Sequence, residues 1–179
     1  MYGIKKPDIE SPATLAKAHN KFGIDNDNVV CVNSRDFLLT LKNQGIPDAS
    51  IFDRNGKYIE YRQTDTSCNA GLFKFIPDLS KDGQYQQPDT LSLQNLFEKF
   101  YTLNGKKASY PSEADFYVLI YYTIWTGKLN KDHVKIWEEL AKANQKAKVK
   151  VVKVNLDMQS WWPENEREML YEVMRNPKK

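Results

Sequence analysis

The sequence predicts an α/β fold in which about five strands form a mixed sheet with helices on both faces. Residues 116–122, Phe-Tyr-Val-Leu-Ile-Tyr-Tyr, are almost continuously apolar, which is typical of a central strand covered on both faces. Across residues 117–154 a strand, a loop, a helical pattern and a β-branched strand follow one another, and this order favours a parallel pair. Asn55-Gly56 joins two shorter strand patterns, which indicates an antiparallel hairpin.

The first half of the chain carries local signals for each of its elements. Ser11-Pro12 is a hydroxyl N-cap followed by proline at the first helical position, and Gly23 can end the helix. The run Val-Val-Cys-Val after Asn28 is β-branched and predicts a buried strand. The expected elements are a helix at 12–23, a strand at 29–32, a helix at 34–45, hairpin arms at 49–53 and 57–62, and a helix at 69–79.

Residues 80–90 have the composition of a loop, so the chain is interpreted as one domain, 1–179, with halves 1–79 and 91–179. The second half opens with apolar residues at i, i+3, i+4, i+7 and i+8, which predicts an amphipathic helix ending at Asn104-Gly105. These residues are Leu93, Leu96, Phe97, Phe100 and Tyr101. The remaining expected elements are a strand at 116–122, a helix at 131–143, a strand at 149–154 and a helix at 163–174.

The composition excludes several classes of protein. With 179 residues, 41% hydrophobic and 27% charged, the chain is neither disordered nor fibrous, and no apolar stretch reaches the roughly 20 residues that span a membrane. The net charge is +3, and no run of Lys or Arg is long enough to follow a phosphate backbone, which argues against nucleic acid as a partner. Two cysteines, Cys31 and Cys68, cannot form a disulfide scaffold or a zinc site of the usual spacing.

The second half resembles the thioredoxin superfamily. In that superfamily a central strand ends in Trp-Cys-Gly-Pro-Cys, and the strand after the next helix ends in Asn-x-Asp. Here Trp125 and Gly127 fall in register with the first pattern, and Asn155-Leu156-Asp157 matches the second. Thr126, Lys128 and Leu129 occupy the places of the first cysteine, the proline and the second cysteine.

The first half resembles the same superfamily at its proline, strand and Asn-Gly hairpin. Gly45-Ile46-Pro47 precedes the strand and hairpin of residues 51–57, so the resemblance makes Pro47 the candidate cis-proline. This hairpin normally follows the strand–helix–strand unit, whereas here it precedes it. The resemblance therefore implies a thioredoxin-like domain of rearranged element order, with two incomplete halves as the alternative.

The expected function is that of a redox-inactive thioredoxin-like module that binds a protein or peptide. Dithiol exchange needs a thiolate at a helix N-terminus and a resolving thiol three residues on, and neither Thr126 nor Leu129 supplies one. The resemblance implies a binding cleft formed by Pro47 and residues Trp125, Thr126, Gly127, Lys128 and Leu129. The adjacent Trp161 and Trp162 cannot both face one interior direction, which makes them a candidate contact surface.

The alternative is a thiol oxidoreductase that uses Cys68 alone or with Cys31. Cys68 directly precedes the helix expected at 69–79, where the helix dipole favours a thiolate. An inert Cys68 and a structural disulfide with Cys31 remain open as well. Cys31 lies between valines and is interpreted as a small core residue.

The sequence indicates no cofactor and no metal site. His19 and His133 are far from each other and from any cysteine pair. Residues 2–7, Tyr-Gly-Ile-Lys-Lys-Pro, resemble the segment after the lipid anchor in envelope lipoproteins of Bacteroidetes-type bacteria. This resemblance implies a cell-envelope or periplasmic location, with membrane attachment only through an anchor ahead of the sequence. Without such an anchor, a cytoplasmic location is expected.

Overall fold

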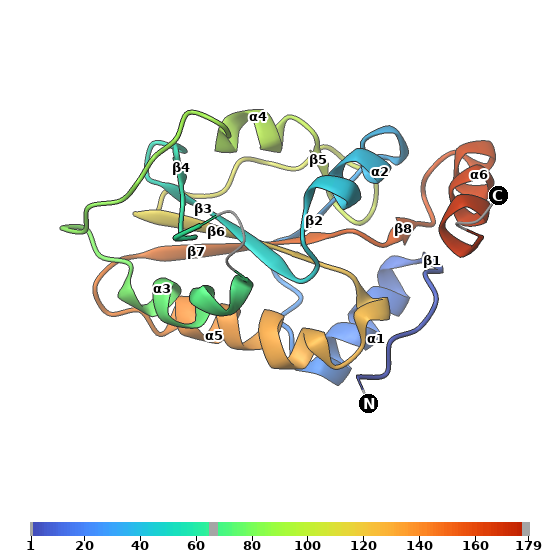
Figure 1. Ribbon diagram of the computed structural model, residues 1–179. Helices are drawn as coiled ribbons and strands as arrows, with labels where there is room; N and C mark the ends of the chain where they lie inside the picture. Colours follow the sequence, from blue (N-terminus) through green and yellow to red (C-terminus); the bar gives the residue numbers. More distant parts are fainter. Residues whose placement is uncertain (1, 65–67, 177–179) are drawn as a thin grey trace.

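The computed structural model describes residues 2–64 and 68–176 (Figure 1). Within these residues the core is a six-stranded mixed sheet of order β4-β3-β6-β7-β2-β5. β6, β7 and β2 are parallel, β3 is antiparallel to β6 and β4, and β5 is antiparallel to β2. The strands are β2 (Val29–Val32), β3 (Asp48–Asp53), β4 (Tyr58–Ile59), β5 (Phe100–Tyr101), β6 (Phe116–Tyr122) and β7 (Val149–Asn155). The predicted mixed α/β fold is confirmed, with six strands in place of about five.

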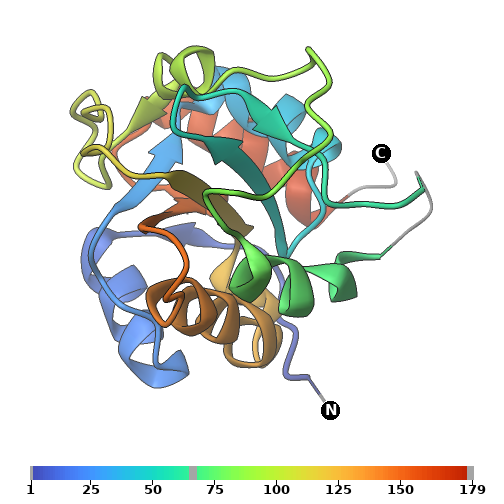
Figure 2. The same ribbon diagram turned by 90° about the vertical axis from the view of Figure 1, so that its left-hand side faces the viewer.

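Helices cover both faces of the sheet. Figure 1 shows α1, α3 and α5 on one side and α2 and α4 on the other, and Figure 2 shows α6 on the side of α2. The helices are α1 (Pro12–Phe22), α2 (Ser34–Asn43), α3 (Leu72–Asp78), α4 (Leu93–Phe97), α5 (Ile136–Lys142) and α6 (Glu164–Arg175). Alternate residues of β6 enter two different cores: Tyr117, Leu119 and Tyr121 pack with α2, α4 and α6, while Val118, Ile120 and Tyr122 pack with α3 and α5. This two-sided burial explains the continuous apolar run.

Several local signals produce the expected structure. The Ser11 side chain accepts a hydrogen bond from the Thr14 amide at the start of α1, and Gly23 ends the helix with φ 71°. In the β3–β4 hairpin, Gly56 adopts φ 75° and the Asp53 amide donates to the Lys57 carbonyl at 2.9 Å. The Ile46–Pro47 peptide bond is cis, as predicted.

The helix predicted over residues 93–104 is wrong beyond its first turns. α4 ends at Phe97, and Phe100 and Tyr101 form β5, which pairs with Val32 and Cys31 of β2. An apolar pair fits the buried side of either a helix or an edge strand, so the long-range pairing with β2 overrides the local helical pattern.

Some elements carry no clear sequence signal. β1 (Ile9–Glu10) and β8 (Met158–Gln159) form a separate parallel pair of two residues each. The helix expected at 131–143 begins as a π-helical segment, η3 (Asn130–Lys135), and the helix expected at 69–79 begins as a 3₁₀ turn, η1 (Asn69–Gly71). None of the helices described is both long enough and apolar enough to cross a membrane.

The strands of the two halves of the chain are interleaved in one sheet. β3 belongs to the first half and lies between β4 and β6, while β2 lies between β7 and β5 of the second half. Residues 80–90 connect the halves without forming a helix or a named strand. The two halves therefore form one sheet, which removes the alternative of two partial ones.

Candidate functional site

One edge of the sheet brings together most residues that the sequence singles out. The parallel strands β6 and β7 end at Tyr122 and Asn155, which are paired with each other, and Asn155 is paired with Cys31. On the other side, Asp48 pairs with Tyr121, so Pro47 lies beside Tyr122. The segment that follows β6, residues 124–129, is termed the Trp125 loop.

The Trp125 loop is held from within by side chains that cap its carbonyl groups. It starts with the 3₁₀ turn η2 (Ile124–Thr126). The Thr126 hydroxyl donates to the Thr123 carbonyl at 2.7 Å. The Asn130 side chain donates from Nδ2 to the carbonyls of Thr123 and Gly127 at 2.9 and 3.1 Å. Thr126 is only 4% exposed. Its hydroxyl therefore serves as an internal cap, and the loop has no base–hydroxyl pair of the kind that activates a nucleophile.

A buried carboxylate lies beneath the same loop. One oxygen of Asp157, Oδ2, accepts hydrogen bonds from the Ile124 amide at 2.8 Å and the Asn155 side chain at 2.7 Å. Burial raises the pKa of Asp157 to about 7, and the nearby Glu10 carboxylate contributes to the rise. Within the part of the chain described, Asp157 Oδ1 and the neighbouring Gln159 Oε1 are buried without a hydrogen-bond partner. Asp157 therefore fixes the start of the loop and titrates near neutral pH.

The N-terminal segment of the chain, residues 2–6, crosses the outside of the Trp125 loop. The Lys5 amide donates to the Trp125 carbonyl at 2.8 Å, and the Lys128 amide donates to the Tyr2 carbonyl at 2.7 Å. Figure 1 shows this dark blue segment beside the loop that follows β6. Gly127 has φ 64° and ψ −125°, a conformation that favours glycine. The carbonyl oxygens of Tyr2 and Gly3 occupy the space that a side chain at Gly127 would need.

A cavity of about 360 Å³ lies beside this contact, between the N-terminal segment and the body of the protein. The N-terminal segment, β1, the end of α1 and the Trp125 loop form its walls, and Trp125 and Lys128 line it. Trp125 is half-buried, Lys128 is exposed and Leu129 is half-buried. Of the predicted cleft residues in the loop, Trp125, Gly127 and Lys128 line this cavity, whereas Thr126 and Leu129 do not. Pro47 does not line this cavity.

Pro47 lies on the neighbouring part of this edge, in contact with Asn69, the residue after Cys68. Pro47 is buried, and its carbonyl accepts a hydrogen bond from the Asn69 side chain at 2.6 Å. Cys68 is exposed and lines a separate cavity of about 550 Å³ together with Arg62 and Lys74. It directly precedes the 3₁₀ turn η1, which continues into α3, so Cys68 stands ahead of a helical segment as the sequence predicts.

Cys31 and Cys68 are both free thiols in the structure. Cys31 is 0% exposed, its thiol donates to the Thr102 carbonyl at 3.4 Å, and burial raises its pKa to about 12. Three strand spacings separate β2 from β3, about 14 Å, which places Cys31 far beyond disulfide reach of the Pro47 region. The disulfide alternative is therefore not realised, and Cys31 is a core residue as predicted.

The two adjacent tryptophans face in different directions at the start of the segment that leads to α6. Trp162 is 2% exposed and donates from its indole nitrogen to the Val32 carbonyl at 3.1 Å. Trp161 is half-buried, with its ring 5.5 Å from that of Tyr101 and close to Gly105. Of the two tryptophans, Trp161 is therefore the one with exposed surface that a partner could contact.

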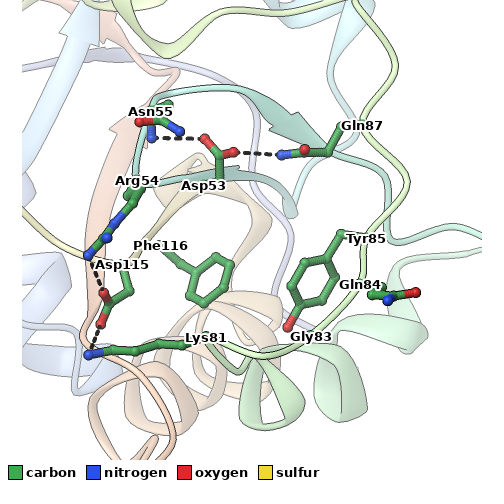
Figure 3. A pocket seen from close by; sticks show the side chains of 10 residues that line it. All are labelled: Asp53, Arg54, Asn55, Lys81, Gly83, Gln84, Tyr85, Gln87, Asp115 and Phe116. Carbon is green, nitrogen blue, oxygen red and sulfur yellow. Dashed lines mark hydrogen bonds and ion pairs between the residues drawn. The ribbon is translucent and has the colours of Figure 1, made fainter.

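A polar cleft of about 460 Å³ lies at the opposite edge of the sheet, and no sequence pattern indicated it (Figure 3). The Asp115 carboxylate meets Arg54 at 3.0 Å and Lys81 at 3.3 Å, and it accepts from the Lys148 amide at 2.8 Å. In the same cleft Asp53 Oδ2 accepts from the Gln87 side chain at 2.7 Å. Both carboxylates thus have cationic or hydrogen-bonding partners within the chain. Since Lys81 and Gln87 belong to residues 80–90, these contacts fasten that loop to the hairpin and to the start of β6.

The described residues offer no evident set of metal-ligating side chains. Across residues 2–64 and 68–176, no group of three or more His, Cys, Asp and Glu side chains is placed to hold a metal ion. Comparison with protein-family models, curated proteins and solved structures gives no match to this chain.

Proposed function

We propose that this protein is a redox-inactive thioredoxin-like module that binds a polypeptide through the main chain of the Trp125 loop. One observation carries the proposal: the Trp125 carbonyl and the Lys128 amide already hold a polypeptide segment, residues 2–5. Thr126 and Leu129 replace the two cysteines that dithiol exchange would need. A loop without a reactive group but with paired main-chain donor and acceptor groups is suited to binding.

The arrangement of the sheet supports the thioredoxin-like part of the proposal. β6 leads into the Trp125 loop and pairs in parallel with β7, which runs into Asn155-Leu156-Asp157. On its other side β6 pairs antiparallel with β3, which follows Pro47. The patterns that carry the resemblance are thus adjacent in space at one sheet edge, although the β3–β4 hairpin precedes β6 in the chain.

The binding proposal can be tested by NMR with unstructured peptides of varied sequence added to ¹⁵N-labelled protein. We expect the largest chemical-shift changes at the amides of the Trp125 loop, Lys128 included, because these groups face the bound chain. Changes confined to the polar cleft at Asp115, or no saturable change with any peptide, would contradict the proposal.

A second candidate function, a single-thiol oxidoreductase, is favoured by one observation. Cys68 is exposed and lines a cavity together with Arg62 and Lys74, so its thiol is accessible to a disulfide substrate. Reduction of insulin disulfides with dithiothreitol as the electron source separates the two functions. Under the binding proposal neither the unaltered protein nor Cys68→Ser accelerates the reaction, whereas turnover that disappears in Cys68→Ser would establish the thiol function.

A further inference from the structure

The contact between the N-terminal segment and the Trp125 loop has the geometry of a bound ligand. Its two hydrogen bonds join Lys5 to Trp125 and Tyr2 to Lys128, so the two stretches run antiparallel over four residues each. Both bonds use main-chain groups only. The contact therefore requires little of the side chains of the segment that crosses the loop.

The absence of a side chain at Gly127 makes the crossing possible. The carbonyl oxygens of Tyr2 and Gly3 lie where a β-carbon would be, and the Thr126 side chain on the preceding residue turns inward to the Thr123 carbonyl. At Thr126 and Gly127 the outer surface of the loop is consequently main chain. A polypeptide backbone is the ligand class that fits such a surface.

The N-terminal segment is held weakly enough to leave. Tyr2 is 56% exposed and Ile4 is 61% exposed, so neither apolar side chain anchors the segment in a core. Two main-chain hydrogen bonds favour the docked state by a factor of only about 5 to 150. A partner chain that forms the same two bonds and adds side-chain contacts can therefore replace the segment.

We propose that residues 2–6 are an intramolecular occupant of the polypeptide site, and that a partner polypeptide binds the Trp125 loop only when this segment leaves. The inference rests on the proposed binding function and adds its regulation. While the segment is docked, the site cannot bind a partner. The apparent affinity for a partner is therefore the intrinsic affinity multiplied by the fraction of time that the segment is undocked.

The test compares Lys5→Pro with Lys5→Ala in the full chain. Proline removes the amide that donates to Trp125, whereas alanine keeps it and loses only the side chain. Lys5 lies outside every helix and strand described, so both variants are expected to fold, and near-ultraviolet circular dichroism verifies this.

Two measurements report separately on the segment and on the site. Hydrogen exchange of the Lys128 amide reports whether the segment is docked. We expect it to be about 2- to 12-fold faster in Lys5→Pro than in Lys5→Ala, because proline removes one of the two hydrogen bonds. Fluorescence anisotropy with a labelled heptapeptide, Tyr-Gly-Ile-Lys-Lys-Pro-Asp, reports whether the site accepts a chain from outside. We expect Kd to be about 2- to 12-fold lower for Lys5→Pro than for Lys5→Ala, because the site is free for a correspondingly larger fraction of the time.

The outcomes distinguish the occupant from the site. Equal Lys128 exchange in the two variants would overturn the intramolecular occupant. Faster exchange without heptapeptide binding would show that the segment leaves a loop that takes no polypeptide, which would overturn the proposed function and the inference that depends on it. Faster exchange together with tighter binding supports both.

Discussion

The replacement of Asp157 by asparagine tests the electrostatics of the Trp125 loop. Asp157 is buried, and its pKa rises from an ordinary 3.8 to about 7. The folded chain therefore binds this proton more tightly than the unfolded chain does. The stability that the protonated group contributes is fully present below about pH 4 and is lost as the pH rises to about 7.

The size of the effect follows from the pKa difference. About three pKa units correspond to about 4 kcal/mol of unfolding free energy lost between acidic and neutral pH, at about 1.4 kcal/mol per unit. Asp157→Asn removes the charge and keeps an oxygen for the Ile124 amide, but it must bury an added N–H group. We therefore expect the variant to be more stable than the unaltered protein at pH 8 by about 2 kcal/mol.

The assay is urea unfolding of both proteins at several pH values from 5 to 8, with Asp89→Asn as the control for an exposed carboxylate. The difference in unfolding free energy between the unaltered protein and Asp157→Asn isolates this group, because all other carboxylates are shared. Glu10→Gln should reduce the difference, since the Glu10 charge adds to the pKa shift of Asp157. A difference that stays constant from pH 5 to 8, or an asparagine variant that is less stable at pH 8, would contradict the raised pKa.

Three further outcomes are expected. A limiting maleimide should label exposed Cys68 in the native protein and buried Cys31 only after denaturation, as peptide mass mapping can show; fast native labelling of Cys31 would contradict its burial. Lys153→Met should lower the unfolding free energy by about 3 kcal/mol in urea titrations, because it leaves the buried Glu138 carboxylate without its closest cation. An unchanged unfolding free energy would mean that the protein does not need this ion pair. Gly127→Ala should lower Tm by several degrees, since its positive φ and the crossing segment both oppose a side chain; an unchanged Tm would argue against the described loop.

The predictable part of the fold depends on signals that are local in sequence. Gly56 could be placed in the hairpin turn because few residues adopt its backbone conformation. The central strand could be recognised because both its faces are buried. β5 could not be predicted, because Phe100 and Tyr101 satisfy a helical pattern equally well and are decided by pairing with β2, about 70 residues away in the chain.

The site was predictable only in part, for a similar reason. The residues Trp125 to Leu129 could be named from the resemblance of the segment after the central strand to the thioredoxin pattern. The crossing segment could not, because it is held by main-chain groups of Lys5 and Lys128 that leave no pattern in the side chains. The ionisation of Asp157 was equally hidden, since it results from burial that only the assembled fold provides.

The interleaving of strands from the two halves sets an order for folding during synthesis. β2 and β3 leave the ribosome first, yet β6 and β7, the strands on which they pair, follow only after residue 115. At about 5 to 20 residues per second, the edge of β3 that pairs with β6 stays open for roughly 3 to 14 seconds. The nascent chain thus presents unpaired strand edges for seconds, until its last third is made, and such edges are templates for pairing with other chains.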